Sequence, residues 1–483
     1  MTFYSLHFLI LFAFTLLSLA VCKLIFKKNT LLLKKINQCI LLTVSYIFVC
    51  IVDWKFCLSV LAVTLTSYFC ALLIDKNRSR AKLFVAIGVI IPTLMLGFFK
   101  YFNFFVSSFN KIFGVDSEFS LNFAVPLGIS FFTFTAISYV VDVYRKKTEV
   151  TKDFIKIALY ISFFPKFISG PIIRASEFMP QLDENRTVSW ENIEKGLQIF
   201  LFGFIKKVVL ADHLGVFVGD VYATPQAYDS FTVILCVISY SLQIYLDFSG
   251  YTDMAIGIAK CVGFDFSKNF NLPYISKNVT EFWKRWHISL SEWLMDYIYI
   301  PLGGNRKGKV RQYINLLLTM LIGGLWHGAN ITFIIWGGLH GLAPIVHKLF
   351  MSVRKNKDGK IATVISVFGT YAFVSLLWVF FRAENFTNAF DILKKIFIWS
   401  DGIHQMYSWS IVSIVAVIAS TVVALIYNKN HKSYDKKGKE TVSGFYPMLE
   451  LSKIWNIAIL LIIAGLAIIL AYTGVSPFIY GKF

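Results

Sequence analysis

The sequence predicts an all-α membrane protein that crosses the bilayer many times, and three observations support this. The chain is 57% hydrophobic and only 16% charged, with a mean hydropathy of +0.64, whereas soluble proteins are about half apolar and a quarter charged. Its apolar residues form continuous blocks of roughly 20, the length of a helix that crosses about 30 Å of hydrocarbon. The blocks do not alternate apolar and polar residues, as the strands of a membrane barrel would.

The net charge of +19 follows the same pattern. Basic residues collect in short loops, at 23–28, 76–82 and 145–147, after every second apolar block. The positive-inside rule places such loops in the cytoplasm and so orients the first third of the chain. This topology accounts for most of the charge, and we expect no nucleic-acid partner.

We expect about eleven to thirteen membrane helices plus re-entrant segments. The predicted spans are 4–26, 36–53, 56–74, 83–105, 123–144, 196–210, 230–248, 313–326, 332–350, 361–380, 408–427 and 454–472, with a short helix at 389–399. No repeat and no linker marks a separate soluble domain. We therefore expect one membrane domain over 1–483, with a catalytic core at roughly 99–350.

Three stretches are less regular. The segment 156–168 meets Pro165 and then Gly170 and Pro171; these residues break helices, so we expect a re-entrant segment there. The stretch 250–274 is too polar to cross simply, and we expect it to be re-entrant or interfacial. From 278 to 294, tryptophans and leucines recur at helical spacing between charged residues, which predicts an amphipathic helix at the headgroup boundary.

His327, in GGLWHGAN, is the first candidate catalytic residue. An imidazole at membrane depth is costly unless it has a partner and a function. Its natural role is a general base toward a hydroxyl, because its pKa lies near working pH. Asn330, one helical turn away, is expected to hydrogen-bond the ring. The alternative is a histidine that ties two membrane helices together.

His287 is the second candidate, in WKRWHISLS. It lies four residues after Trp283 and four before Ser291, so a continuous helix would place the three on one face. The alternative is an interfacial histidine bonded to a lipid headgroup. Another histidine, His340, is interpreted as a packing or supporting residue.

Asp247 lies just inside a predicted span, where a carboxylate is a functional hypothesis by default. The alternative is a buried ion pair or a helix cap with a nearby lysine or arginine. The chain has no GxSxG, P-loop, HExxH or CxxC motif, so we expect no metal and no covalent serine mechanism. The candidate substrate-binding residues are Asp247, Asn330, Trp286, Trp326 and Ser291.

Several longer strings together resemble the membrane-bound O-acyltransferase (MBOAT) family, in the branch that acetylates bacterial surface polysaccharides such as alginate and peptidoglycan. The resemblance covers the chain from about Phe99 onward. The strings are FKYFNFF, PLGISFFTFTAISYVVDVYR, FFPKFISGPIIR, FGFIKKVVLAD, YLDFSGYTDMAIGIA, NFNLPYISKNVTEFWKRWHISLSEWLMDYIYIPLGG, GLWHGANITFIIWGGLHG and LLWVFFRAENFTNAF.

The resemblance implies a ring of helices around a central tunnel, in the cytoplasmic membrane of a bacterium. The near-invariant histidine of the family matches His327, and the second polar position of this branch matches His287. The implied reaction moves an acetyl group from cytoplasmic acetyl-CoA, with no bound cofactor, to an extracytoplasmic polysaccharide or a partner transferase. A basic loop contains Arg306, Lys307, Lys309 and Arg311. Its positive charge would attract the phosphates of the donor, although positive-inside topology alone also explains these basic residues.

Three alternatives are open. A related branch of the family transfers D-alanine from a carrier protein to teichoic acid, so the identity of the donor would decide between the branches. A proton-coupled transporter would need paired broken helices in two halves of the chain. A scaffold without catalysis would tolerate the loss of His327.

Overall fold

The computed structural model describes residues 2–114, 124–184, 186–353, 359–430, 433–434, 440–441, 448–474 and 479. The chain folds into two compact units. The first comprises Met1–Leu197 with Ala255–Ser267, and the second comprises Gln198–Met254 with Lys268–Phe483. The chain passes from one unit to the other inside two long helices and again after Ser267. The predicted single domain over 1–483 stays a prediction.

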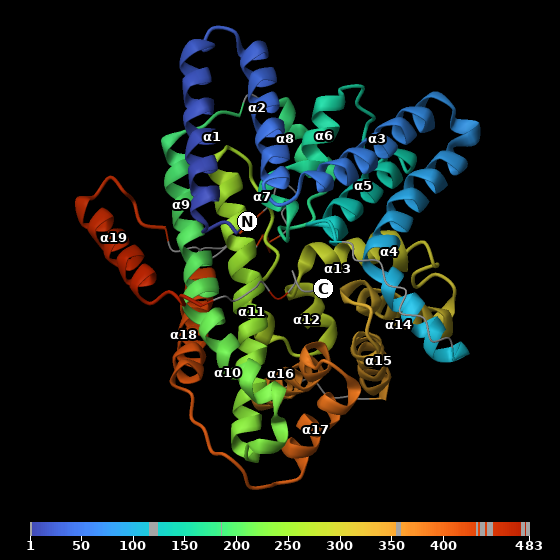
Figure 1. Cartoon of the computed structure of the whole chain (residues 1–483), viewed down its shortest axis with the longest axis vertical. Helices are drawn as coiled ribbons and strands as arrows, with labels where there is room; N and C mark the ends of the chain where they lie inside the picture. Colours follow the sequence, from blue (N-terminus) through green and yellow to red (C-terminus); the bar gives the residue numbers. More distant parts are fainter. Residues whose placement is uncertain are drawn as a thin grey trace. The chain divides into compact units, whose positions relative to one another are not determined.

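Several helices of the first unit begin at polar caps. Side-chain oxygens of Ser5, Asn29 and Asp53 accept hydrogen bonds from the first free N–H groups of three successive helices. The first two helices form an antiparallel pair (Figure 1). The elements are α1 (Leu6–Ile25), α2 (Thr30–Cys50), α3 (Trp54–Lys76), η1 (Arg78–Arg80), α4 (Ala81–Phe113), α5 (Ile129–Tyr144), α6 (Phe154–Ser162), α7 (Phe164–Phe167), α8 (Ala175–Asp183) and the start of α9 (Trp190–Phe204).

The predicted helix break near Pro165 is confirmed. Helix α6 ends at Ser162, and α7 is a single turn that carries the proline at its start. Two hydrogen bonds to other segments hold the broken backbone. The Phe164 N–H donates to Ser45 Oγ at 3.1 Å, and the Tyr160 hydroxyl donates to the Ile173 carbonyl at 3.0 Å. These bonds give partners to an N–H and a carbonyl that a continuous helix would have paired within itself. The predicted re-entrant course of this segment stays a prediction.

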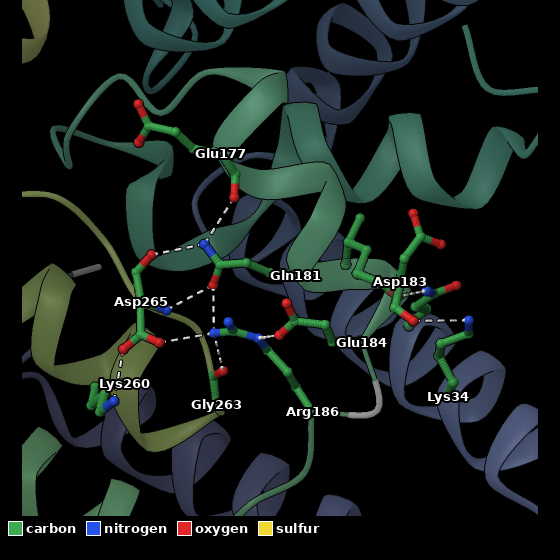
Figure 2. Close-up of polar contacts among 11 residues, drawn as sticks. Lys34, Glu177, Gln181, Asp183, Glu184, Arg186, Lys260, Gly263 and Asp265 are labelled. Atoms are coloured by element: carbon green, nitrogen blue, oxygen red, sulfur yellow. Dashed lines mark hydrogen bonds and ion pairs between the residues drawn. The ribbon is translucent and has the colours of Figure 1, made fainter. Parts of the chain in front are cut away.

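A polar clamp in the first unit centres on Arg186 (Figure 2). Its Nη1 donates to Gln181 Oε1 at 2.7 Å, to the Gly263 carbonyl at 3.1 Å and to Asp265 Oδ2 at 2.9 Å. Lys260 Nζ lies 2.7 Å from the other oxygen of Asp265. Burial raises the pKa of Asp265, but the hydrogen bonds and charges of Lys260 and Arg186 outweigh it and hold this pKa below its usual range. The clamp thus ties the segment after α8 to the segment after α11.

The second unit contains the candidate site. Its elements are the rest of α9, the π-helix η2 (Ile205–Ala211), α10 (Asp212–Ala223), η3 (Pro225–Ala227), α11 (Ser230–Cys261, whose last residues belong to the first unit), η4 (Pro273–Ile275), α12 (Val279–Arg285), α13 (Ile288–Leu294), the π-helix η5 (Met295–Tyr299), α14 (Gly308–His327), α15 (Ile331–Val353), α16 (Lys360–Arg382), α17 (Phe386–Phe397), α18 (Ser408–Asn430) and α19 (Ile454–Ile469). Two-residue strands, β1 (Ser433–Tyr434) and β2 (Glu440–Thr441), pair antiparallel.

Helix α11 corrects the prediction for 250–274, because it continues without a break to Cys261. Two facts explain how its polar residues are accommodated. Gly203 of α9 and Gly250 of α11 pack backbone against backbone, since a Cβ on Gly203 would lie 2.4 Å from the Gly250 carbonyl oxygen. This approach brings the lysines of η2 to α11, where Lys206 Nζ lies 2.6 Å from Asp253 Oδ2. The paired charges allow the helix to continue at membrane depth.

Helices long and apolar enough to cross a membrane confirm the all-α, polytopic prediction. Within the part of the chain that the structure describes, eight such segments occur, and α5 and α19 are shorter apolar helices. The eight are Leu6–Ile25, Thr30–Cys50, Trp54–Lys76, Arg78–Asn110, Ser230–Cys261, Ile331–Met351, Lys360–Arg382 and Ser408–Tyr427. The ring and the central tunnel stay predictions.

Candidate active site

The tight packing of α14 against α15 positions His327. The two helices lie side by side and antiparallel (Figure 1), and glycines make this possible. A Cβ on Gly324 would lie 2.3 Å from the Phe333 carbonyl oxygen, and one on Gly337 would lie 2.4 Å from that of Met320. Helix α14 then ends at His327, and Gly328 is extended, which confirms the predicted interruption between the two helices.

The imidazole of His327 is 4% exposed and lies among aromatic rings. Its centroid lies 5.1 Å from Trp336 at an interplanar angle of 90°, and 5.0 Å from Phe381 at 73°. Trp326, the preceding residue, lies 4.7 Å away. These rings fix the position of the imidazole and exclude bulk water from its faces.

His287 breaks the predicted amphipathic helix. Helix α12 ends at Arg285 and α13 begins at Ile288, because His287 adopts a left-handed conformation with φ of 43°. A histidine rarely adopts this conformation, which costs roughly 1–3 kcal/mol and persists where the surroundings impose it. The prediction of a continuous helix that places His287, Trp283 and Ser291 on one face is therefore wrong.

The side chain of Asn269 holds this break in place. Its Oδ1 accepts from the Ser289 N–H at 3.1 Å and from the Ser289 hydroxyl at 2.9 Å, and it lies 3.1 Å from His287 Nδ1. The backbone carbonyl of Asn269 also accepts from the Ile288 N–H at 2.9 Å. Asn269 is 1% exposed, so a single buried amide determines both the backbone turn and the direction of the ring.

The same contacts determine the protonation of His287. Because Oδ1 accepts the Ser289 N–H, it is an acceptor toward the ring as well, so His287 Nδ1 carries a proton. Burial lowers the pKa of His287 to about 3. The ring is therefore neutral, with its lone pair on Nε2.

Trp326 contacts both candidate histidines. Its ring centroid lies 4.7 Å from that of His327 and 6.4 Å from that of His287. Phe248 packs edge-on against His287 at 4.7 Å and 88°. The structure thus brings the two imidazoles, forty positions apart in the chain, to the same indole ring. Their chemical roles stay predictions.

The other candidates from this region pack nearby. Trp286 is 1% exposed and contacts the rings of Trp378 and Phe270, each at 5.0 Å. The Ser291 hydroxyl donates to the Trp286 carbonyl at 3.3 Å. Asn330 caps α15, where its Oδ1 accepts from the Thr332 N–H at 3.1 Å and its Nδ2 donates to the Glu384 carbonyl at 2.8 Å. A role in substrate binding stays a prediction for all three.

Asp247 belongs to a buried charge triad. Lys207 Nζ lies 2.6 Å from both Asp247 Oδ1 and Asp212 Oδ1, and the three side chains are at most 5% exposed. The Ile479 N–H donates to Asp247 Oδ2 at 2.8 Å. This geometry matches the ion-pair alternative for Asp247. Sequence reasoning did not pair these residues, although two adjacent lysines inside an apolar span signal a need for carboxylate partners.

His340 lies in the aromatic cluster around Trp336. It is fully buried, and its Nδ1 accepts from Trp283 Nε1 at 3.3 Å. Its ring centroid lies 4.8 Å from Trp336, which in turn contacts His327. This placement agrees with a packing or supporting role.

The family model of the membrane-bound O-acyltransferases (MBOAT) matches residues 90–382, which is more than half of the chain. The chain belongs to the membrane-bound O-acyltransferase family. It is therefore an acyltransferase, and the transporter alternative loses its support. The matched region contains both candidate histidines and the hairpin of α14 and α15.

Several relatives of this acyltransferase are known. It is 41% identical to "Probable alginate O-acetylase AlgI" of Pseudomonas syringae over 376 residues, which cover 76% of this chain and 71% of the relative. It is 40% identical to "Peptidoglycan O-acetyltransferase" of Helicobacter pylori over 356 residues, which cover 68% of this chain and 67% of the relative. A "Teichoic acid D-alanyltransferase" of Bacillus subtilis is more distant. It is 27% identical over 276 residues, which cover 54% of this chain and 69% of the relative.

Proposed function

We propose that this MBOAT enzyme transfers an acetyl group from cytoplasmic acetyl-CoA to a hydroxyl of a cell-envelope or secreted polysaccharide, directly or through a partner transferase outside the membrane. We further propose that it resides in the cytoplasmic membrane of a bacterium. The observation that carries the proposal is the convergence of two buried histidines on Trp326. The relatives at about 40% identity, named for O-acetylation, support acetyl as the transferred group.

In the proposed mechanism His327 is the general base. It takes the proton of the acceptor hydroxyl as the oxygen attacks the thioester carbonyl. The tetrahedral intermediate then collapses, the carbon–sulfur bond breaks, and the proton passes from His327 to the departing thiolate. His287, neutral with its lone pair on Nε2, accepts a hydrogen bond and orients the acceptor. No residue of the enzyme is acylated in this scheme.

The exposed basic cluster in the loop before α14 and in the first turn of α14 supports a phosphate-bearing donor. Arg306, Lys307, Lys309 and Arg311 are all exposed, and such a cluster raises the local concentration of anionic substrates. A carrier-borne D-alanyl donor is the second candidate, favoured by the D-alanyltransferases among the relatives. Membranes supplied with radiolabelled acetyl-CoA or with a radiolabelled D-alanyl carrier protein would separate the two donors.

The test of the proposal compares surface O-acetylation in cells with wild type, His327→Ala or His287→Ala, at membrane levels matched by immunoblot. We expect acetyl esters to disappear with His327→Ala and to fall strongly with His287→Ala. His404→Ala is the matched control, because His404 is exposed and pairs with Asp229 at 2.7 Å. Undiminished esters in His327→Ala at equal expression would show that His327 is not the base.

A further inference from the structure

Two cysteine thiols of the first unit meet at the turn between α2 and α3. Cys50 is the last residue of α2, and Cys57 lies in the first turn of α3. Their Sγ atoms lie 2.8 Å apart. Non-bonded carbon atoms pack at about 3.5–4.0 Å, and sulfur is larger than carbon. The two sulfurs are therefore closer than ordinary packing brings them.

The turn itself holds the two thiols together. Asp53 caps α3, since its Oδ1 accepts from the Lys55 N–H at 2.9 Å. Its own N–H donates to the Val49 carbonyl at 3.2 Å, which closes the end of α2. The Cys57 thiol donates to the Tyr46 carbonyl of α2 at 3.7 Å. The contact between the sulfurs thus depends on neighbouring residues of one hairpin and not on a distant segment.

A pair of thiols can hold a metal ion or form a disulfide. A structural zinc site needs four ligands, but no group of three or more His, Cys, Asp or Glu side chains that could hold a metal occurs among the described residues. A disulfide needs only two sulfurs, and here a further approach of under about 1 Å. The geometry therefore favours a disulfide over a metal site.

We expect the turn to lie on the extracytoplasmic side of the membrane. Basic residues at 23–28 and 76–82 mark the cytoplasmic ends on either side of the hairpin of α2 and α3, so its turn points the other way. Trp54, at this turn, is exposed, as is typical of a tryptophan at the membrane–water interface. Disulfides persist in the bacterial periplasm and on cell surfaces, whereas cytoplasmic thiols stay reduced. The expected topology therefore places both cysteines on the side where oxidation occurs.

We propose that Cys50 and Cys57 are a disulfide site, oxidised by thiol–disulfide exchange with a soluble disulfide outside the cytoplasm. The Cys50 thiolate attacks the oxidant first, because Cys50 is exposed and Cys57 is half-buried. One sulfur of the oxidant leaves as a thiol, and Cys50 is held in a mixed disulfide. The Cys57 thiolate then attacks the Cys50 sulfur and releases the second thiol. Two cysteines are oxidised and one disulfide is reduced to two thiols, which take up the two cysteine protons.

The disulfide joins the end of α2 to the start of α3 through a covalent loop. It is separate from the proposed acyl transfer, which uses no cysteine. A cross-link of this kind stabilises a fold mainly by restricting the unfolded chain, and a short loop restricts it least. We therefore expect reduction to lower the melting temperature of the oxidised wild type by about 5 °C.

The experiment exposes spheroplasts that carry the full-length enzyme to oxidised glutathione, which does not cross the membrane. Free thiols are then blocked with N-ethylmaleimide in denaturant, and tryptic peptides are analysed by mass spectrometry before and after reduction. Trypsin cleaves after Lys55, between the two cysteines. The disulfide therefore joins two peptides that separate only on reduction, and we expect this linked pair in most wild-type molecules.

Cys39→Ser is the matched control, because Cys39 is an exposed cysteine of the same helix α2. This variant should keep the linked pair of peptides and the fall in melting temperature on reduction. Cys50→Ser and Cys57→Ser should lose both. Each variant should elute from size exclusion like the wild type, which separates the loss of the disulfide from a loss of folding.

Three outcomes would overturn the proposal. One is recovery of the oxidised wild type with N-ethylmaleimide on both Cys50 and Cys57. Another is a linked pair that forms only when the oxidant is added to inside-out vesicles, which would place the turn in the cytoplasm. The third is a reducible dimer in place of the internal link, which would assign Cys50 to a contact between two copies of the chain.

Discussion

Asn269→Ala should disable the candidate active site without changing a catalytic side chain. The amide oxygen accepts three hydrogen bonds, from His287 and from two atoms of Ser289. Its removal leaves two donors of fixed direction, His287 Nδ1 and the Ser289 N–H, without this acceptor. Each buried donor in this situation costs about 1–3 kcal/mol, so for the two donors we expect the free energy of unfolding to fall by about 2–6 kcal/mol.

The effect on catalysis should be larger than the effect on stability. Without Asn269 the imidazole of His287 can rotate, and its proton is no longer confined to Nδ1. A displacement of about 1 Å in an active site costs roughly a hundredfold in rate. We therefore expect acetyl transfer per folded molecule to fall by about this factor. The assay is transfer from radiolabelled acetyl-CoA in membranes, normalised to the folded protein measured by fluorescence-detected size exclusion.

Asn315→Ala is the matched control for this experiment. Asn315 is also fully buried, and its Nδ2 donates to the Gly304 carbonyl at 3.0 Å. Asn315→Ala loses one hydrogen bond and should lower the free energy of unfolding by about 1–3 kcal/mol, but it should retain its activity per folded molecule. Wild-type activity in folded Asn269→Ala would refute the reasoning, as would an equal loss of activity in both variants.

Further predictions concern packing and buried charge. Gly203→Ala should lower the free energy of unfolding by about 1–3 kcal/mol through overpacking against α11. Gly219→Ala should not, because a Cβ there meets no atom within 4 Å. Equal thermal stability of the two variants in detergent would contradict the contact between α9 and α11. Lys207→Met should cost about 3–5 kcal/mol because it removes the counter-charge shared by two buried carboxylates. Unchanged stability of this variant would exclude the triad. Arg186→Ala should lower stability at neutral pH, and the difference from wild type should shrink as acid protonates Asp265. The ionised Asp265 stabilises the fold only above its lowered pKa, whereas the bonds of Arg186 to Gln181 and Gly263 do not depend on this protonation. A pH-independent difference would refute this role for the clamp.

Local signals in the sequence predicted much of the fold. The apolar blocks predicted the long helices, Pro165 predicted the break between α6 and α7, and the separate spans 313–326 and 332–350 predicted the interruption after α14. The cost of an imidazole at membrane depth singled out His327. These signals act within a few residues along the chain, so a sequence pattern records them.

Features that depend on distant partners were not predictable in this way. Helix α11 continues past Asp253 because Lys206, 47 positions earlier, supplies the counter-charge. The helix around His287 breaks because Asn269, 18 positions earlier, offers one oxygen to several donors. Helical spacing favoured a continuous helix at this point, and only the tertiary contact reverses that preference. Asn269 and Ser289 carry no signal of their own in the sequence.

The π-helix η2 has a consequence for how this segment can change in evolution. A π-helix accommodates one residue more than an α-helix of the same length, and the adjacent Lys206 and Lys207 thereby reach carboxylates on separate sides, Asp253 and Asp247. Deletion of one codon within Ile205–Ala211 would restore an α-helix and turn the following residues by about 100°. A substitution at Lys206 removes one ion pair and one at Lys207 removes two, whereas deletion of the codon for Ile205, which precedes both lysines, would turn both away from their partners at once.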